Sequence, residues 1–321
     1  MATYKSTKGF TVQVLADDPT VEDTVGLLYF NTTDNEFKYC RPGGVSAATW
    51  SSGGALNVAV ANSGGAGTQT AALNFGGVPG VATSESYNGS SWTEGNDLNT
   101  GRSELAGSGS QTAAIAAGGL PNTAATEEYG GTSWTNGGNL NTARRRGGMA
   151  GNSSAALFFG GFPGYTAISE LYDGTSWTEV GDLNDGRANV GSAGISTAAV
   201  CISGAGEPVT VNVETWNGTS WTEINNVNRG RSNGGSGGTA STALFFGGEP
   251  AGENTEYFDG TSWSELANLA TDRYQISRGN VGTAELGICI GGTGPAGPNP
   301  ILTVTEEWVL PEVVIKTVSD S

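Results

Sequence analysis

The sequence predicts an all-β chain in which six similar units close into a ring. Six tryptophans mark the units at steps of 42, 42, 43, 44 and 42 residues: Trp50, Trp92, Trp134, Trp177, Trp221 and Trp263. No window keeps the apolar period of a helix, and short apolar runs are interrupted by Asn-Gly and Asp-Gly, which favour tight hairpin turns. Glycine contributes 53 of the 321 residues, but a disordered chain would not keep a constant spacing of tryptophans, so the repetition indicates a folded repeat protein.

Three further positions recur at fixed distances from the last five tryptophans. An aromatic residue lies five positions before each of them: Tyr87, Tyr129, Tyr172, Trp216 and Phe258. A glutamate lies seven positions before: Glu85, Glu127, Glu170, Glu214 and Glu256. An arginine lies ten positions after: Arg102, Arg144, Arg187, Arg231 and Arg273. Each unit therefore carries the same four chemical markers in one order.

Each unit divides into four short strands. A stretch of small residues follows the arginine, an apolar run such as ALFF ends at Gly-Gly, and two further runs flank the turn of segments such as YDGTSW. Gly and Ala suit the innermost strand of a radial array, where neighbouring backbones crowd near the axis. Four strands in a unit of roughly 40–50 residues are typical of a β-propeller blade.

The order Arg, Gly-Gly, Glu-x-aromatic, Trp resembles the kelch-type propeller repeat, over roughly residues 45 to 309. The resemblance implies that the arginine opens the innermost strand of each blade and that the tryptophan lies on the outermost strand.

The two ends of the repeat region predict how the ring closes. Complete four-strand units begin near five residues: Val60, Arg102, Arg144, Arg187 and Arg231. The sixth unit begins at Arg273, reaches Glu306 and Trp308, and stops before a fourth strand, whereas Thr49-Trp50 is a fourth strand with nothing before it. We therefore predict a six-bladed propeller over residues 45–309, with the Trp50 strand completing the last blade. Such closure removes exposed sheet edges.

The charge composition excludes several functions. The formal net charge is −17 and the chain contains no His. Nucleic-acid binding and docking on anionic membranes need clusters of Lys and Arg, so we expect no nucleic-acid partner and no membrane insertion. Without His, Ser-His-Asp and Cys-His catalysis and imidazole metal sites cannot form, and no turn shows an EF-hand-like series of ligands. We expect no metal and no other cofactor.

The three cysteines fit a chain made in a reducing cytoplasm, and no Sec-type signal is visible at its start. Cys201 and Cys289 lie two positions before the Gly pair of the fourth and sixth blades. Because these blades are not neighbours, the two residues are expected to exceed disulfide reach and to be small buried apolar side chains.

The repeated charges allow two interpretations. Both the arginine and the glutamate of a blade are expected near one face, because the loops 2–3 and 4–1 of an up-and-down blade share that face. In the first interpretation, five arginines ring the channel mouth and hold an acidic partner or a sugar acid, as the resemblance to kelch domains that bind acidic peptides implies. In the second, each arginine pairs with a nearby glutamate and locks adjacent strands. Six glutamates, Glu306 included, against five arginines favour the structural interpretation.

We expect no enzymatic activity. Glycoside chemistry needs two special carboxylates, whereas most carboxylates here recur from unit to unit and the others are scattered. A glycan-degrading propeller enzyme stays open as an alternative, because fold alone does not settle function.

Two segments lie outside the repeat. Residues 1–44 contain GLLYFNTTDNEFKYC, which predicts a strand, a polar turn over Asn31–Asn35 and a second strand. This hairpin resembles one found near the N-termini of tailed-phage structural and fibre proteins, and the blade text resembles propeller proteins of marine phages, including cyanophages. The resemblance implies that residues 1–44 anchor the chain to other virion proteins. The tail, residues 310–321, is expected to pair with a neighbouring chain or to be loose.

These observations predict a non-enzymatic virion protein, made in the host cytoplasm, whose propeller contacts a host-surface protein or glycan or other virion proteins from the tail or fibre. A capsid decoration protein is the competing placement, and a cellular kelch scaffold lacks a second domain. The loops 2–3 are the expected contact surface, because they differ most between blades. The residues singled out there are Pro79, Pro121, Phe162, Tyr165, Glu207, Glu249 and Asn299.

Overall fold

The computed structural model describes residues 13–15, 28–33, 35–40, 48–206, 208–250, 252–295, 300–310 and 315–317. The chain divides into two compact units, one formed by Thr49–Val309 and the other by Met1–Ala48 together with Leu310–Ser321. Each unit is described by itself. The described residues contain no helix long and apolar enough to cross a membrane.

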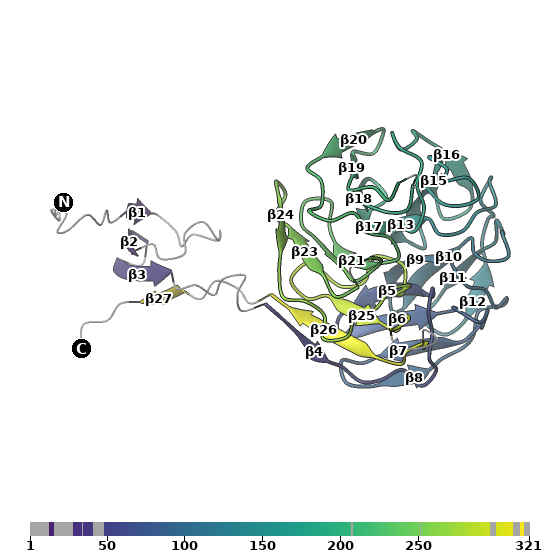
Figure 1. Ribbon diagram of the computed structural model, residues 1–321, viewed down its shortest axis with the longest axis horizontal. Helices are drawn as coiled ribbons and strands as arrows, with labels where there is room; N and C mark the ends of the chain where they lie inside the picture. The colour runs from purple at the N-terminus through teal and green to yellow at the C-terminus, as the bar shows by residue number, and fades with distance from the viewer. Residues whose placement is uncertain are drawn as a thin grey trace. The chain divides into compact units, whose positions relative to one another are not determined.

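The unit Thr49–Val309 is a six-bladed β-propeller, as the tryptophan spacing predicts (Figure 1). Five blades are four-stranded antiparallel sheets whose strands follow one another in chain order. Blade 1 comprises β5 (Gly64–Thr68), β6 (Ala71–Phe75), β7 (Ser84–Tyr87) and β8 (Trp92–Glu94). Blade 2 comprises β9 (Ala106–Ser110), β10 (Ala113–Ala117), β11 (Thr126–Tyr129) and β12 (Trp134–Asn136). Blades 3 to 5 comprise β13 (Gly148–Asn152), β14 (Ala155–Phe159), β15 (Ser169–Tyr172), β16 (Trp177–Glu179), β17 (Gly191–Ile195), β18 (Ala198–Ile202), β19 (Val213–Trp216), β20 (Trp221–Ile224), β21 (Gly235–Gly238), β22 (Ala243–Phe246), β23 (Thr255–Phe258) and β24 (Trp263–Glu265).

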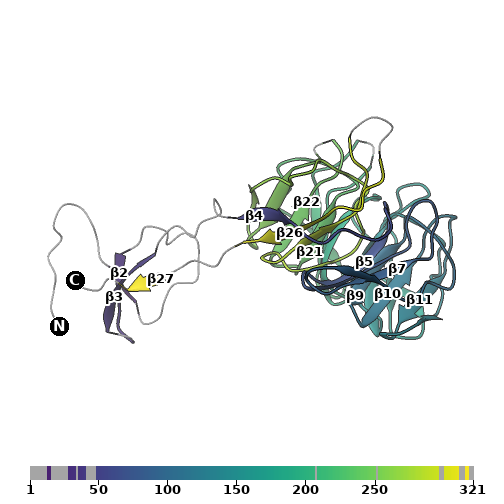
Figure 2. The ribbon, with the colours of Figure 1, turned by 90° about the horizontal axis from the view of Figure 1, so that it is seen from below.

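The sixth blade joins the two ends of the repeat region. Its sheet has the order β25 (Ile288–Ile290), β26 (Thr305–Val309) and β4 (Thr49–Ser52). The register places Trp308 opposite Trp50 and Val309 opposite Thr49. The predicted closure by the N-terminal strand is therefore confirmed, and Figure 2 shows β4 beside β26.

The innermost strand predicted for blade 6 does not form. In blades 2, 3 and 5 the arginine and the first glycine of the Gly pair are 16 positions apart, whereas Arg273 and Gly291 are 18 positions apart. The two extra residues let Arg278, Gly279 and Asn280 leave the blade and make single parallel bridges to the inner strands of three other blades, at Gly64, Gly107 and Ser236 respectively. The segment thus lies across the propeller axis.

Small residues permit this crowding. A Cβ on Gly107 would meet the Gly65 backbone at 2.7 Å, and one on Gly279 would meet the Gly65 and Gly107 carbonyl oxygens at 2.4 Å. The expectation that Gly belongs to the innermost strands because backbones meet at the axis is confirmed by these distances.

The repeated tryptophans fasten each blade to the one before it. Trp134 packs edge-on against Phe75 of blade 1 at 4.8 Å between ring centroids. Its indole N–H donates to Ser84 Oγ at 3.0 Å, at the start of the third strand of that blade. Four further indoles, those of Trp50, Trp92, Trp177 and Trp221, reach a Ser or Thr hydroxyl at the same place. Trp263 differs because the third strand of blade 4 begins with Val213, which has no hydroxyl group. The indole N–H of Trp263 donates to the Asn225 carbonyl instead.

The second unit is one small sheet built from both ends of the chain. Its order is β1 (Gln13–Leu15), β2 (Leu28–Asn31), β3 (Glu36–Cys40) and β27 (Ile315–Thr317). The predicted hairpin is present, with Leu28 opposite Tyr39. Residues 315–317 of the tail pair with β3 of the same chain, with Ile315 opposite Cys40, so for these residues the prediction of a loose segment or of pairing with a neighbouring chain is wrong.

Cys201 and Cys289 are expected to resist alkylation in the native protein. Both are free and fully buried. Burial raises the pKa of the Cys201 thiol and raises that of Cys289 to about 12, so neither forms the reactive thiolate near neutral pH. Peptide mass mapping after iodoacetamide treatment should find both thiols labelled only in denaturant. Labelling of either residue in the folded state at pH 8 would contradict this description.

Candidate functional site

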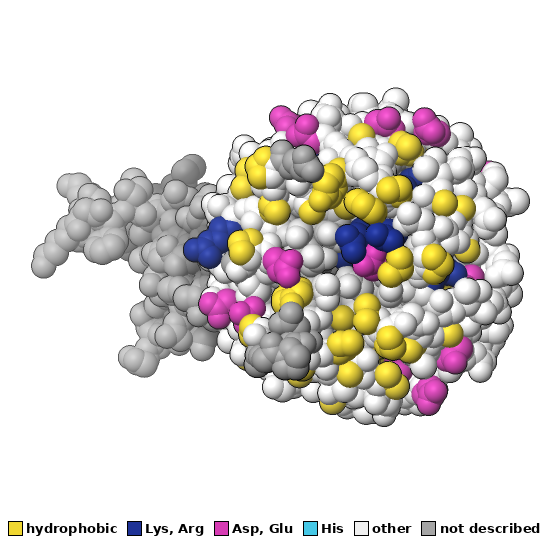
Figure 3. All heavy atoms as spheres, turned by 45° about the vertical axis from the view of Figure 1, so that its right-hand side comes forward, with side chains coloured by type: hydrophobic (Ala, Val, Ile, Leu, Met, Phe, Trp, Pro, Cys, Tyr) yellow, Lys and Arg dark blue, Asp and Glu magenta, His cyan; other side chains and the backbone are white. Residues whose placement is uncertain are grey.

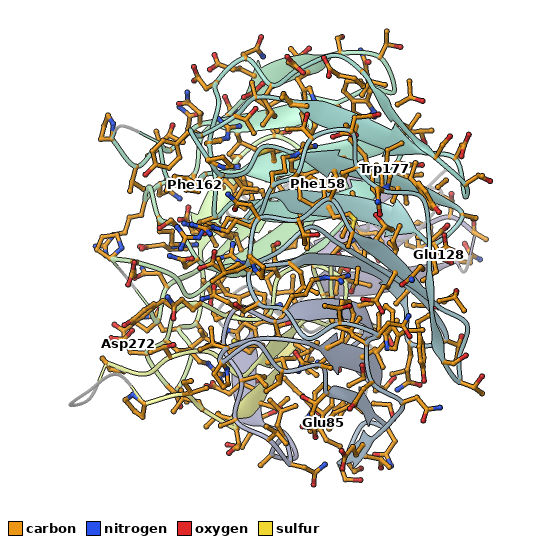
Figure 4. All side chains as sticks on the ribbon, turned by 90° about the vertical axis from the view of Figure 1, so that its right-hand side faces the viewer. Glu85, Glu128, Phe158, Phe162, Trp177 and Asp272 are labelled. Atoms are coloured by element: carbon orange, nitrogen blue, oxygen red, sulfur yellow. The ribbon has the colours of Figure 1, made fainter. Side chains whose placement is uncertain are left out.

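Two sets of loops share one face of the propeller. In each blade, the loop that enters the first strand makes a single antiparallel bridge to the loop between the second and third strands, as in Ser103–Leu120 and Arg145–Phe162. Figure 4 shows Phe162 and Asp272, from these two kinds of loop, on the same side, with Trp177 and Glu128 toward the other side. The expectation that loops 2–3 and 4–1 lie on one face is confirmed.

The repeated arginines and glutamates form ion pairs inside the blades. The nitrogen–oxygen distances are 2.7 Å for Arg102–Glu127, 2.9 Å for Arg187–Glu214, 3.2 Å for Arg231–Glu256 and 2.7 Å for Arg273–Glu306, and Arg144 pairs with Glu170 in the same way. No side chain of these pairs is more than 2% exposed. Burial lowers the pKa of Arg231 to about 10, which leaves it charged at neutral pH. These pairs are the arrangement of the second interpretation, in which each arginine pairs with a glutamate inside its blade rather than presenting its charge at the channel mouth.

Each glutamate also holds the loop that arrives from the preceding blade. Glu170 accepts hydrogen bonds from Asn141 N at 2.7 Å, Asn141 Nδ2 at 2.8 Å and Thr142 N at 3.3 Å. Glu85 keeps the same arrangement with Asn57 and Val58 although Val60 stands where the other blades have arginine. The glutamate therefore serves the junction between blades with or without its cation.

A ring of six residues surrounds the axis on this face, each two positions after the repeated arginine or Val60. All six have positive φ values, between 52° and 63°: Asn62, Glu104, Arg146, Asn189, Asn233 and Gln275. Backbone hydrogen bonds link them around the axis, as from Glu104 N to Asn62 O at 2.8 Å and from Arg146 N to Glu104 O at 2.9 Å. Non-glycine residues adopt this conformation rarely, and Asn most readily. Sequence reasoning missed this ring; the signal was a polar residue at this position in every unit.

Arg278 fills the centre of the ring. Its Nη2 donates at 2.8 Å to the Oδ1 atoms of Asn62, Asn189 and Asn233. The side chain is buried, and burial lowers the pKa of Arg278 to about 10. Its Nε has no hydrogen-bond partner in the described part of the chain. One signal for this residue was visible beforehand, the longer spacing of the sixth unit.

Arg145 and Arg146 share the carboxylate of Glu104. Arg146 holds it with two hydrogen bonds, at 2.8 Å and 2.6 Å, and Arg145 Nε lies 2.9 Å from the same group. Both guanidinium groups lie over the Phe162 ring, at 4.9 Å and 5.7 Å from its centroid. Their side chains are 18% and 33% exposed. We call the six-residue ring together with Arg145 and Arg278 the axial mouth. Figure 3 shows Lys and Arg side chains gathered near the middle of one face, bordered by hydrophobic side chains.

The predicted contact residues lie on the loops around the axial mouth. Pro79, Pro121 and Glu249 are exposed, while Phe162 and Tyr165 are half-buried and pack edge-on at 6.0 Å. Glu207 and Asn299 lie outside the described residues. A cleft of about 450 Å³ opens beside blade 4, lined by residues that include Asp185, Arg187, Pro208 and Val209.

The architecture and this face define the class of protein. It is a six-bladed β-propeller in which the Arg278 segment lies across the axis and the axial mouth is polar and built from loops. No family model and no curated protein matches the sequence. Among solved structures, the chain is similar to YjhT, with a TM-score of 0.68 and 13% identity over 83% of this chain and 99% of that one. At this identity the likeness shows the fold alone.

Proposed function

We propose that the protein is a non-enzymatic component of a tailed-phage virion, in which a kelch-type propeller on the tail or fibre contacts the host surface or another virion protein. In this proposal the contact is made by the loops around the axial mouth, and the N-terminal segment attaches the chain to the particle.

One observation carries the proposal: the residues that repeat in the blades are buried, while the loops 2–3, which differ between blades, carry exposed apolar side chains. Of the eight large apolar side chains that are at least 36% exposed among the described residues of the propeller, four lie in loops 2–3: Leu120, Val209, Val211 and Ile301. Variable surface loops on a rigid scaffold are common places for binding residues. The resemblance of the N-terminal hairpin to those of tailed-phage proteins supports the placement in a virion.

The arrangement of carboxylates supports a contact protein rather than an enzyme. In the ring of six residues, the single carboxylate is that of Glu104, and both of its oxygens are taken by arginines. A general base needs an oxygen free to accept a proton from a substrate.

The placement is tested by immunogold labelling of purified phage particles with antibody raised against the propeller. Label on tails or fibres is the expected result. Label confined to capsids would establish the decoration alternative instead, and unlabelled particles would overturn the virion role.

The contact face is tested by two matched substitutions. Leu120→Glu changes a 41% exposed aliphatic residue on the loop face, and Ile195→Glu changes a 59% exposed one at the end of β17, beside a turn on the opposite face. We expect Leu120→Glu to weaken binding of the labelled protein to host cells about tenfold, because a charge is costly to bury at an interface, and Ile195→Glu to leave binding unchanged. Equal effects of the two variants would contradict this choice of face.

A further inference from the structure

We propose that the axial mouth binds a single oxyanion, a carboxylate, sulfate or phosphate group, between the guanidinium groups of Arg145, Arg146 and Arg278. The inference names the chemistry of a partner for the face proposed above and rests on that proposal only for its biological purpose.

The distribution of cations is the first argument. The propeller contains nine arginines and no lysine against 23 acidic residues. Five arginines are neutralised within the blades. Three of the remaining four, Arg145, Arg146 and Arg278, meet at the axial mouth. In a strongly acidic molecule, this is an unusual concentration of positive charge.

The charges there are not balanced. Glu104 is the one carboxylate paired with these arginines among the described residues, which leaves three cations for one anion. Arg278 makes its hydrogen bonds to neutral amide oxygens, and it is only 5% exposed. Burial of a guanidinium is unfavourable when its nearest carboxylate is shared with two other cations, as Glu104 is here, so an anion bound at this point would be stabilised by all three arginines.

Two amide groups beside the centre have no partner of their own among the described residues. Asn62 and Asn189 turn their Oδ1 atoms to Arg278, so their Nδ2 groups point elsewhere. No described residue accepts a hydrogen bond from those two amide groups. The Phe162 ring beneath Arg145 and Arg146 excludes water from one side, which strengthens a charge-assisted hydrogen bond. Guanidinium groups bind carboxylate and phosphate oxygens in pairs of hydrogen bonds.

The test is calorimetric titration of the full chain with inorganic phosphate, sulfate and acetate, at constant ionic strength in chloride. We expect saturable binding of at least one anion, and the ranking of acetate against the two tetrahedral anions identifies the oxyanion preferred. Arg146→Gln should weaken that binding about tenfold or more, the loss of one charged hydrogen bond. Arg229→Gln is the control, because it removes the remaining arginine, which is exposed and makes a 3.5 Å contact with Asn254.

A second variant separates binding from folding. Glu104→Gln removes the competing carboxylate and should tighten anion binding about tenfold, a gain that a merely damaged structure would not produce. Absence of saturable binding by the unmodified chain, or weaker binding by Glu104→Gln, would overturn the inference. Either result would leave the effect of Leu120→Glu on host-cell binding untouched, so failure here is distinguishable from failure of the proposed contact face.

Discussion

A chain lacking residues 1–55 is expected to lose its closed ring and to associate through the exposed edge of β26. In the full chain, β4 pairs with β26 over four residues, and Trp50 lies between blades 5 and 6, at 4.9 Å from Phe246 and 5.3 Å from Trp308. Removing a fully buried tryptophan costs about 3–5 kcal/mol, and the half-buried Trp50 is lost here together with the whole strand. The strand also protects backbone groups that would otherwise pair with other molecules. We expect the melting temperature to fall by about 10 °C or more.

The matched control is a chain lacking residues 1–47, which removes most of the N-terminal segment but keeps β4. Its melting temperature should be close to that of the full chain and it should remain monomeric, because the blade-6 sheet is intact. Light scattering and differential scanning calorimetry distinguish the two chains. If the chain lacking residues 1–55 also stayed monomeric and melted at the temperature of the full chain, closure by the Trp50 strand would not stabilise the propeller.

Replacing Glu170 by glutamine is expected to destabilise the protein by about 3–5 kcal/mol, the usual effect of breaking a buried ion pair from one side. The Arg144 side chain is fully buried, and without the Glu170 charge it would keep a 3.3 Å hydrogen bond to the Thr142 carbonyl and its position over the Phe158 ring, neither of which supplies a negative charge. Burial already lowers the pKa of Arg144, which shows that the charged form is held in place against a desolvation penalty. The free energy of unfolding in urea measures the effect.

The reverse substitution, Arg144→Met, should destabilise less. Glu170 would keep its three hydrogen bonds from Asn141 and Thr142, the arrangement that Glu85 already has beside Val60. The double variant should recover part of the stability lost in Glu170→Gln, since no lone cation remains. Glu85→Gln is the control, because blade 1 lacks the arginine, and it should lower the free energy of unfolding less than Glu170→Gln does. An Arg144→Met variant less stable than Glu170→Gln would show that the arginine, not the carboxylate, organises the junction.

The blades could be predicted from the sequence because each one is a local hairpin series repeated in register. The turns at Asn-Gly and Asp-Gly depend on neighbouring residues within one unit, and the Gly pairs and tryptophans recur in units of about 42 residues. Closure was also predictable, since an incomplete unit at one end and a single fourth strand at the other have only one complementary match. The interpretation of Arg and Glu as structural partners followed from their numbers, six glutamates against five arginines expected at the same depth.

The axial mouth was not predictable in the same way. Arg278 reaches Asn62 and Asn233, which are 216 and 45 positions away, and these residues meet only after all blades have closed. A two-residue increase in spacing shows that blade 6 differs, but it does not say which residues leave the sheet.

The repeat by itself determined the number of blades, the order of their strands and the way the ends are joined, because these depend on short-range turn chemistry copied along the chain. The folded ring alone decided which cations are neutralised and which remain. Three arginines share the axial mouth with one carboxylate because six loops converge there, and convergence of distant segments is a property of the closed ring rather than of any unit.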